Sequence, residues 1–102
     1  MPTQVVQINF NYAAPTNELL AALKATAGPI SKVPGLVWKV WLLNEAKKEA
    51  GGIYLFDSEA AAQKYLSSEI VTGMTTNPAI RNPSVKQFRV EEELSRITRA
   101  PV

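Results

Sequence analysis

The segment "GLVWKVWLLN", residues 35–44, carries both tryptophans of the chain, Trp38 and Trp41, with Lys39 between them. Side chains of an extended strand alternate between its two faces, so this odd spacing places the two indole rings on opposite faces. A Val-Pro-Gly break at residues 33–35 precedes the segment. The pattern therefore predicts a strand that is apolar on both faces.

A second apolar run follows closely. In "GIYLF", residues 52–56, two aliphatic side chains alternate with Tyr54 and Phe56. The polar stretch "NEAKKEAGG", residues 44–52, separates the two runs. Two short strands joined by polar residues and glycine are typical of an antiparallel hairpin, here with a long connection.

The chain on either side of this hairpin contains alternating segments and segments with helical spacing. We expect a strand over 4–12, a helix over 16–31, a helix over 59–75, a loop over 75–83, a strand over 84–93 and an extended or short helical tail over 94–102. The order βαββαβ predicts a ferredoxin-like α+β fold in one domain over residues 1–102. It has a four-stranded antiparallel sheet with two helices on one face.

Two helices can cover only one face of such a sheet, so the other face should be polar where it meets water. The outer strands are expected to follow this rule with Gln7, Asn9 and Asn11 in the first and Gln87, Arg89 and Glu91 in the last. The tryptophan strand does not follow it, because Val37, Trp41 and Leu43 oppose Leu36, Trp38, Val40 and Leu42.

A chain of 102 residues has no third layer with which to cover this second apolar face. Each large side chain left in water would forfeit about 1.5 to 3 kcal/mol. The pattern predicts a homodimer that packs sheet against sheet, forming a dimeric α+β barrel. One tryptophan then faces the monomer's core or cavity and the other the dimer seam. Alternation alone does not decide which, although Trp38 shares its face with more of the apolar residues.

The composition excludes several kinds of chemistry. The chain has no histidine and no cysteine, which rules out a Ser-His-Asp triad, a thiol nucleophile and imidazole or thiolate metal sites. Asp57 is the only aspartate, and the Gly51-Gly52 pair forms neither a P-loop nor a dinucleotide-binding motif. We therefore expect no metal and no cofactor.

Neither the net charge nor the hydropathy indicates a nucleic-acid or membrane partner. The formal net charge is +2 and the basic residues are scattered, so neither a nucleic-acid partner nor a membrane surface is expected. The longest apolar run, residues 36–43, falls far short of the roughly 20 residues that span a bilayer. No secretory signal is visible, and the absence of cysteine is compatible with the cytoplasm, where we expect the protein to act.

The central third of the chain, "PGLVWKVWLLNEAKKEAGGIYLF" followed by "DSEAAAQKYL", residues 34–66, resembles the YdhR family of small monooxygenases. The shared features are PG-x-x-W-K-x-W, then GG-x-Y-L-F, then a Ser/Ala-rich helix that ends in Tyr. The resemblance implies a monomer that dimerises into an α+β barrel, as in the antibiotic-biosynthesis monooxygenases that oxidise polyketide quinols without a cofactor. At three positions where those enzymes carry Asn, Trp and Tyr, this chain has Gly52, Phe56 and Ala62, with Tyr65 one turn further on.

We expect the sequence to encode a cofactor-independent monooxygenase that acts on a small planar aromatic or quinone-like compound. An electron-rich phenol, once deprotonated, can react with oxygen itself, so the protein need only hold the ring, remove water and stabilise the anion. The alternative is a non-catalytic module on the same fold that binds a small molecule or acts in a stress response. Oxygen uptake with a reduced quinol separates the two.

The candidate catalytic residues are Lys39, Tyr54 and Tyr65. A lysine in the middle of a doubly apolar strand can be buried with a lowered pKa, which suits a base or an anion-binding cation. The alternative is that its stem lies along the dimer seam while its ammonium reaches water or a partner carboxylate. The candidate substrate-binding residues are Phe10, Tyr12, Trp38, Trp41, Phe56 and Arg81. The aromatic members are otherwise core residues, and Arg81 is otherwise a solvated loop charge.

Overall fold

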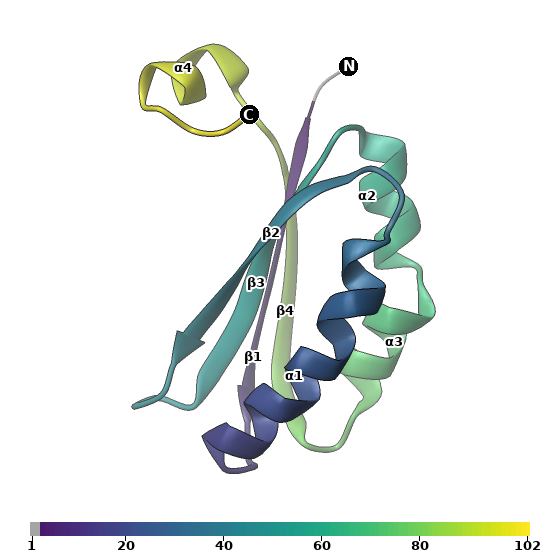
Figure 1. Ribbon diagram of the computed structural model, residues 1–102, viewed down its shortest axis with the longest axis vertical. Helices are drawn as coiled ribbons and strands as arrows, with labels where there is room; N and C mark the ends of the chain where they lie inside the picture. The colour runs from purple at the N-terminus through teal and green to yellow at the C-terminus, as the bar shows by residue number, and fades with distance from the viewer. Residues whose placement is uncertain (1–2) are drawn as a thin grey trace.

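Four antiparallel strands form one sheet in the order β2-β3-β1-β4 (Figure 1). The structure is a computed structural model that describes residues 3–102. The strands are β1 (Gln4–Tyr12), β2 (Leu36–Asn44), β3 (Glu49–Phe56) and β4 (Ile80–Arg89). The helices are α1 (Thr16–Ser31), α2 (Glu59–Leu66), α3 (Glu69–Thr76) and α4 (Glu92–Ile97).

The helices divide unequally between the two sides of the sheet. In Figure 1, α1, α2 and α3 all lie on one side of the strands, and the short α4 lies apart from them near the C-terminus. This arrangement confirms the predicted ferredoxin-like α+β fold. None of the helices in the described part of the chain is long and apolar enough to cross a membrane.

Strand β1 occupies the centre of the sheet and shows the alternation that its sequence predicts. Val6, Ile8, Phe10 and Tyr12 are buried, whereas the residues between them are only half-buried. Tyr54 and Phe56 of β3 join Val6 and Ile8 in the main core cluster, which also includes Tyr65 of α2. The core therefore lies between the sheet and the three helices.

The hairpin connection is shorter than predicted. Strand β3 begins at Glu49 rather than at Gly52, so only residues 45–48 connect it to β2. The two glycines are part of the strand, where Gly51 pairs with Asn9 and Gly52 with Ile8 of β1. A Cβ at Gly51 would collide with the backbone of Ile8, so a glycine here permits β1 to approach closely.

The helix predicted over 59–75 is wrong as a single element, because it breaks into α2 and α3 at Ser67 and Ser68. The Ser67 hydroxyl donates hydrogen bonds to the carbonyls of Gln63 and Lys64, and Ser68 adopts an extended conformation as the residue before α3. Serine side chains compete for backbone groups in this way and favour helix ends over helix interiors.

The loop predicted over 75–83 is also wrong in its second half. Strand β4 starts at Ile80, which pairs with Tyr12, and Arg81 pairs with Asn11. A register irregularity follows, with Asn82 at a positive φ of 51°. Because β4 is an edge strand, Pro83 can be accommodated without a lost ladder hydrogen bond. The strand ends at Arg89, four residues before its predicted end, and α4 follows.

Three side chains, Leu36, Gln87 and Arg89, lie on the opposite face from that predicted. Arg89 does so because it pairs with the buried Gln4. A bulge at Val37 pairs Leu36 with Phe56, so Leu36 packs on the helix-side core instead of sharing a face with Trp38. Gln87 pairs with Val6 and donates to Gln4, and it accepts a hydrogen bond from Gln63 of α2. Gln87 therefore faces the helices rather than solvent.

The face away from α1, α2 and α3, which we call the outer face, is polar along the middle of β1, where Gln7 and Asn9 lie as predicted, and apolar along β2. Trp38 pairs with Leu55 on this side, and Phe88 pairs with Val5. Exposure is 54% for Phe88 and 50% for Val40, values that are high for large apolar side chains. The C-terminal tail reaches this face, where its Pro101 carbonyl accepts a hydrogen bond from the Trp38 indole.

Candidate functional site

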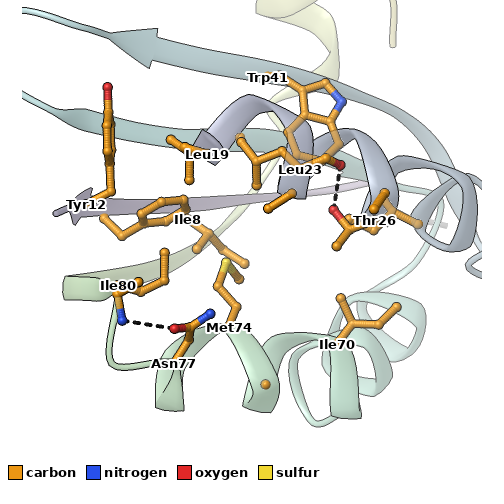
Figure 2. A pocket seen from close by; sticks show the side chains of 18 of the residues that line it. Ile8, Tyr12, Leu19, Leu23, Thr26, Trp41, Ile70, Met74, Asn77 and Ile80 are labelled. Atoms are coloured by element: carbon orange, nitrogen blue, oxygen red, sulfur yellow. Dashed lines mark hydrogen bonds between the residues drawn. The ribbon is translucent and has the colours of Figure 1, made fainter. Parts of the chain in front are cut away.

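A cavity of about 600 Å³ lies between the sheet and helices α1 and α3. It exists because α1 makes few close backbone approaches to the strands, which leaves space beneath it. Figure 2 shows Leu19 and Leu23 from α1 on one side and Ile70 and Met74 from α3 on the other. The volume falls within the ~300–1,000 Å³ of typical small-molecule sites.

The wall that β2 and β3 contribute holds a cluster of polar atoms. The Lys39 ammonium donates a hydrogen bond of 2.7 Å to the Tyr54 hydroxyl oxygen. The Tyr65 hydroxyl donates to the same oxygen at 2.9 Å. All three residues line the cavity. The three candidate catalytic residues are thus joined in one chain of hydrogen bonds, Lys39–Tyr54–Tyr65.

Burial sets the electrostatics of this cluster. Desolvation lowers the pKa of Lys39 from 10.5 to about 7, so its amine is partly uncharged near neutrality. Desolvation also raises the pKa of Tyr54 and of Tyr65, which keeps both hydroxyls protonated. In residues 3–102 the two ion pairs are Arg89–Glu91 and Arg96–Glu92, so no carboxylate restores the charge on Lys39.

Aromatic rings hold the lysine in place. Its Nζ lies 3.3 Å from the centroid of the Trp41 ring and 4.3 Å from that of Tyr54. A cation over an aromatic face gains about 0.5–2 kcal/mol, so this contact favours the charged form of Lys39. The two rings therefore hold the ammonium at a defined position on the cavity wall.

Gly52 provides the space for this lysine. A Cβ built at Gly52 would lie 2.5 Å from Lys39 Cε and 3.4 Å from its Nζ. The stem of Lys39 therefore lies directly over the glycine, across the β2–β3 ladder. Any larger side chain at position 52 would push the amine away from Tyr54.

The two tryptophans face opposite sides of the sheet, as their spacing requires. Trp41 lines the cavity and also borders a smaller hollow of about 240 Å³ between α1 and β2, which Leu23 shares (Figure 2). Trp38 lies on the outer face. The choice that alternation left open is decided in favour of Trp41 as the cavity residue.

The other candidate binding residues separate into two groups. Phe10 and Tyr12 line the cavity, and the Tyr12 hydroxyl forms a hydrogen bond of 2.8 Å with Thr16. Phe56 is fully buried behind the cavity wall, where its ring lies 6.1 Å from Tyr54 and 5.5 Å from Tyr65. Arg81 is exposed on edge strand β4 and does not line the cavity.

Sequence reasoning did not single out most of the apolar lining. Leu19 and Leu23 show helical spacing but are equally consistent with core residues, and Ile70 and Met74 lie within the helix predicted over 59–75 without any feature that marks them as cavity residues. Gly52 carries a usable signal, because a glycine inside a strand often marks a close approach, here of the Lys39 stem. Among residues 3–102, no group of carboxylates gathers to form a metal site.

Comparison with known families assigns the chain to one family. The family model described as "Putative mono-oxygenase ydhR" matches residues 5–101, nearly the whole chain. No curated protein matches the sequence significantly.

Solved structures show the same fold at low sequence identity. SnoaB from Streptomyces nogalater, a cofactor-independent oxygenase, has a TM-score of 0.72 at 15% identity, covering 89% of this chain and 95% of SnoaB. Protein SO0527 from Shewanella oneidensis has a TM-score of 0.72 at 13% identity, covering 87% and 91%. A mutant of MhuD with two manganese protoporphyrin IX molecules per active site has a TM-score of 0.65 at 20% identity, covering 85% and 94%.

Proposed function

We propose, from the premise that this chain belongs to the YdhR family of mono-oxygenases, that it oxidises a small planar phenol or quinol with molecular oxygen and without a cofactor. One observation carries the proposal. The amine of Lys39 and the hydroxyls of Tyr54 and Tyr65 form a buried hydrogen-bonded chain on the wall of an apolar cavity. Apolar walls with a few convergent polar groups are typical of small-molecule sites.

The cavity suits a flat apolar ligand. Aromatic side chains from three strands, Phe10, Trp41 and Tyr54, form part of its wall, and aliphatic side chains of α1 and α3 complete it. A planar ring can stack on these side chains while its hydroxyl meets the amine of Lys39. Exclusion of water around the ring strengthens every electrostatic contact within the site.

Lys39 is the proposed base. Its uncharged amine accepts the phenolic proton, and the resulting ammonium stays beside the phenolate. The hydroxyl of Tyr54 can donate a hydrogen bond to the same anion, because Tyr54 accepts rather than donates toward Lys39 and Tyr65. Stabilisation of the anion by fixed donors is the main catalytic contribution that a cofactor-free site can make.

The oxidation balances with substrate and oxygen alone. A quinol with an unsubstituted ring position gives up four electrons and two hydrogen atoms. One oxygen atom of O₂ enters the ring to give a hydroxyquinone, and the other leaves as water. No external reductant is needed, which is consistent with a chain that lacks the usual ligands of flavin phosphates and transition metals.

Two of the structural neighbours support this assignment. SnoaB is a cofactor-independent oxygenase on the same fold, and MhuD accommodates manganese protoporphyrin IX, a large planar molecule. The family itself is one of mono-oxygenases. At 15% and 20% identity the neighbours support the use of the fold for such ligands, and the identity of the substrate rests on the cavity.

We also propose that the protein acts as a homodimer in which a second copy covers the outer face. Phe88 and Val40 are at least half exposed there, and Trp38 lies on the same face, next to Val40 along β2. Burial of such side chains contributes about 1.5–3 kcal/mol each. A two-fold axis across the sheet covers both copies at once.

Oxygen uptake tests the proposed function. The purified protein, stripped of metals with a chelator, is mixed with a panel of planar quinols, and oxygen consumption is followed against Lys39→Met. We expect saturable uptake that falls by at least about 100-fold in the variant, the usual scale for loss of a general base. Saturable quinol binding without uptake would overturn the oxygenase and favour a binding module.

A further inference from the structure

The geometry points to a second reactivity at the same cavity: we propose that Lys39 condenses reversibly with planar aromatic aldehydes to form an imine. The amine lies on the wall of a cavity whose lining is mainly apolar. It has no carboxylate partner in residues 3–102, and its one polar contact is the hydroxyl oxygen of Tyr54. A lysine held this way can act as a nucleophile toward a carbonyl.

The position of the amine is fixed by its neighbours. Trp41 and Tyr54 hold Nζ at 3.3 Å and 4.3 Å from their ring centroids, and Gly52 leaves room for the stem. The nitrogen is therefore presented to the cavity instead of sampling many rotamers, as a surface lysine does. A flat aldehyde that stacks against Trp41 brings its carbonyl carbon to this nitrogen.

The condensation balances without any further reagent. The Lys39 nitrogen lone pair attacks the carbonyl carbon and gives a carbinolamine. The carbinolamine then loses its oxygen as water, and a carbon–nitrogen double bond forms. The departing oxygen needs a proton, which the Tyr54 hydroxyl, 2.7 Å from Nζ, can donate, and Tyr54 regains a proton from the nitrogen as the neutral imine forms. Tyr65, which donates to Tyr54, keeps that hydroxyl oriented.

Burial gives this lysine an advantage over the others. The remaining lysines are exposed on the surface: Lys24, Lys32, Lys47, Lys48, Lys64 and Lys86. An amine with an ordinary pKa near 10.4 is uncharged in only about one molecule in a few thousand at neutral pH. Desolvation brings the pKa of Lys39 to about 7, so a large fraction is free to react. Condensation should therefore be selective for Lys39.

The proposal uses the cavity of the proposed function but needs no oxygen. Labelling under argon separates the two, because imine formation can succeed where quinol oxidation fails and the reverse. A carbonyl compound that condenses with Lys39 also removes the proposed base. An aromatic aldehyde is then expected to inhibit the oxygenase in a time-dependent, reversible manner.

Reductive trapping provides the test. The intact protein is incubated under argon at neutral pH with 2-hydroxy-1-naphthaldehyde, reduced with sodium borohydride, digested and mapped by mass spectrometry. We expect one adduct per chain, on Lys39, formed roughly tenfold or more faster than on any other lysine. An adduct distributed over the surface lysines, with Lys39 unmodified, would overturn the proposal, and this result needs no variant to fold.

Two variants sharpen the result. Lys39→Met should lose the fast adduct, whereas Lys64→Met, which removes an exposed lysine of α2, should retain it at the wild-type rate. Tyr54→Phe should slow trapping while the naphthaldehyde still binds, because only the proton donor is lost. Equal trapping rates in wild type and Tyr54→Phe would remove Tyr54 from the mechanism and contradict the proposal as stated.

Discussion

Lys39 is the proposed base, and its titration can be measured directly. In the folded protein its pKa is about 7, against 10.5 for an ordinary lysine. Between these two values the unfolded chain holds a proton that the folded chain has lost. The unfolded state then binds more protons, so the free energy of unfolding rises with pH across this window.

Comparison with Lys39→Met isolates that contribution. We expect the melting temperature of the wild type to rise relative to the variant as pH increases from about 7 toward 10, with no relative change below about pH 6. The variant itself should be as stable as the wild type or more so near neutrality, because an apolar side chain replaces a buried charge. Parallel melting curves at all pH values would show that Lys39 is not buried as described. A loss of about 1–3 kcal/mol in the variant would instead show that the charged amine makes a stabilising interaction that Met does not replace.

The pH dependence of activity should follow the titration of Lys39. The proposed base must be uncharged, so kcat/KM for a quinol is expected to rise with pH through an apparent pKa near 7 and then level off. Steady-state oxygen uptake across the neutral range provides the profile. A profile that falls with increasing pH would identify the ammonium, and not the amine, as the active form.

Substitutions at the two glycines of β3 distinguish an effect on the position of Lys39 from an effect on folding. Gly52→Ala places a Cβ against the flexible end of Lys39, so the fold should persist while the amine moves toward solvent and its pKa rises. Gly51→Ala places a Cβ against the backbone of β1 and should destabilise the protein by about 1–3 kcal/mol. Gly73→Ala of α3, whose added Cβ would meet no atom within 4 Å, is the control for the titration of Lys39.

Nuclear magnetic resonance of isotope-labelled lysine measures the Gly52→Ala effect. The Lys39 signal should titrate near neutrality in the wild type and in Gly73→Ala, and at a clearly higher pH in Gly52→Ala. An unchanged titration in Gly52→Ala would contradict the role given to this glycine.

At the scale of elements, the cavity depends on the separation between α1, α3 and the sheet. Met74 of α3 points into this space in Figure 2, whereas Thr72 of the same helix is exposed. Met74→Trp should fill part of the cavity and weaken quinol binding at least about tenfold, with a small change in stability, because added volume enters existing space.

The matched variant is Thr72→Trp, which adds the same ring to the solvent side of α3. It should bind quinols as the wild type does, as judged by calorimetry or thermal shift. If both variants bind normally, the ligand occupies some other part of the molecule.

Sequence periodicity predicted the bounds of the elements that have a clear local pattern of apolar residues. It failed where side-chain hydrogen bonds or pairing between strands set the bounds. Strand β1 and helix α1 match their predicted bounds, 4–12 and 16–31, because each has a clean apolar period. The break at Ser67 depends on side-chain hydrogen bonds to the preceding turn. The early start of β4 depends on pairing with β1, a tertiary contact that a local pattern does not contain.

Sequence patterns likewise predicted some residues of the candidate site and misplaced others. Lys39, Tyr54 and Tyr65 stood out because their residue types carry chemistry. In the structure Lys39 and Tyr54 form a cross-strand pair, and Tyr65 reaches them from α2. Phe56 and Trp38 satisfy the same patterns, yet one lies behind the cavity wall and the other on the outer face. The bulge at Val37, which no residue type marks, changes which side chains share a face.

At the scale of the whole molecule, the outer face predicts assembly. Phe88→Lys places a charge on this face, whereas Val85→Lys places it on the helix side of the same edge strand. The wild type and Val85→Lys should sediment as dimers at micromolar concentration, and Phe88→Lys as a monomer. A soluble wild-type monomer at that concentration would leave the exposed apolar face without an explanation and contradict the dimer.

Oxidation under ¹⁸O₂ tests the central claim most directly, because it follows the atoms themselves. The metal-free protein is supplied with a planar quinol that it binds, and product and water are examined by mass spectrometry. We predict a hydroxyquinone that carries one ¹⁸O atom, with the other ¹⁸O in water, and at least about 100-fold less product with Lys39→Met. A product without ¹⁸O, or equal yields from wild type and Lys39→Met, would contradict oxygenation at this site.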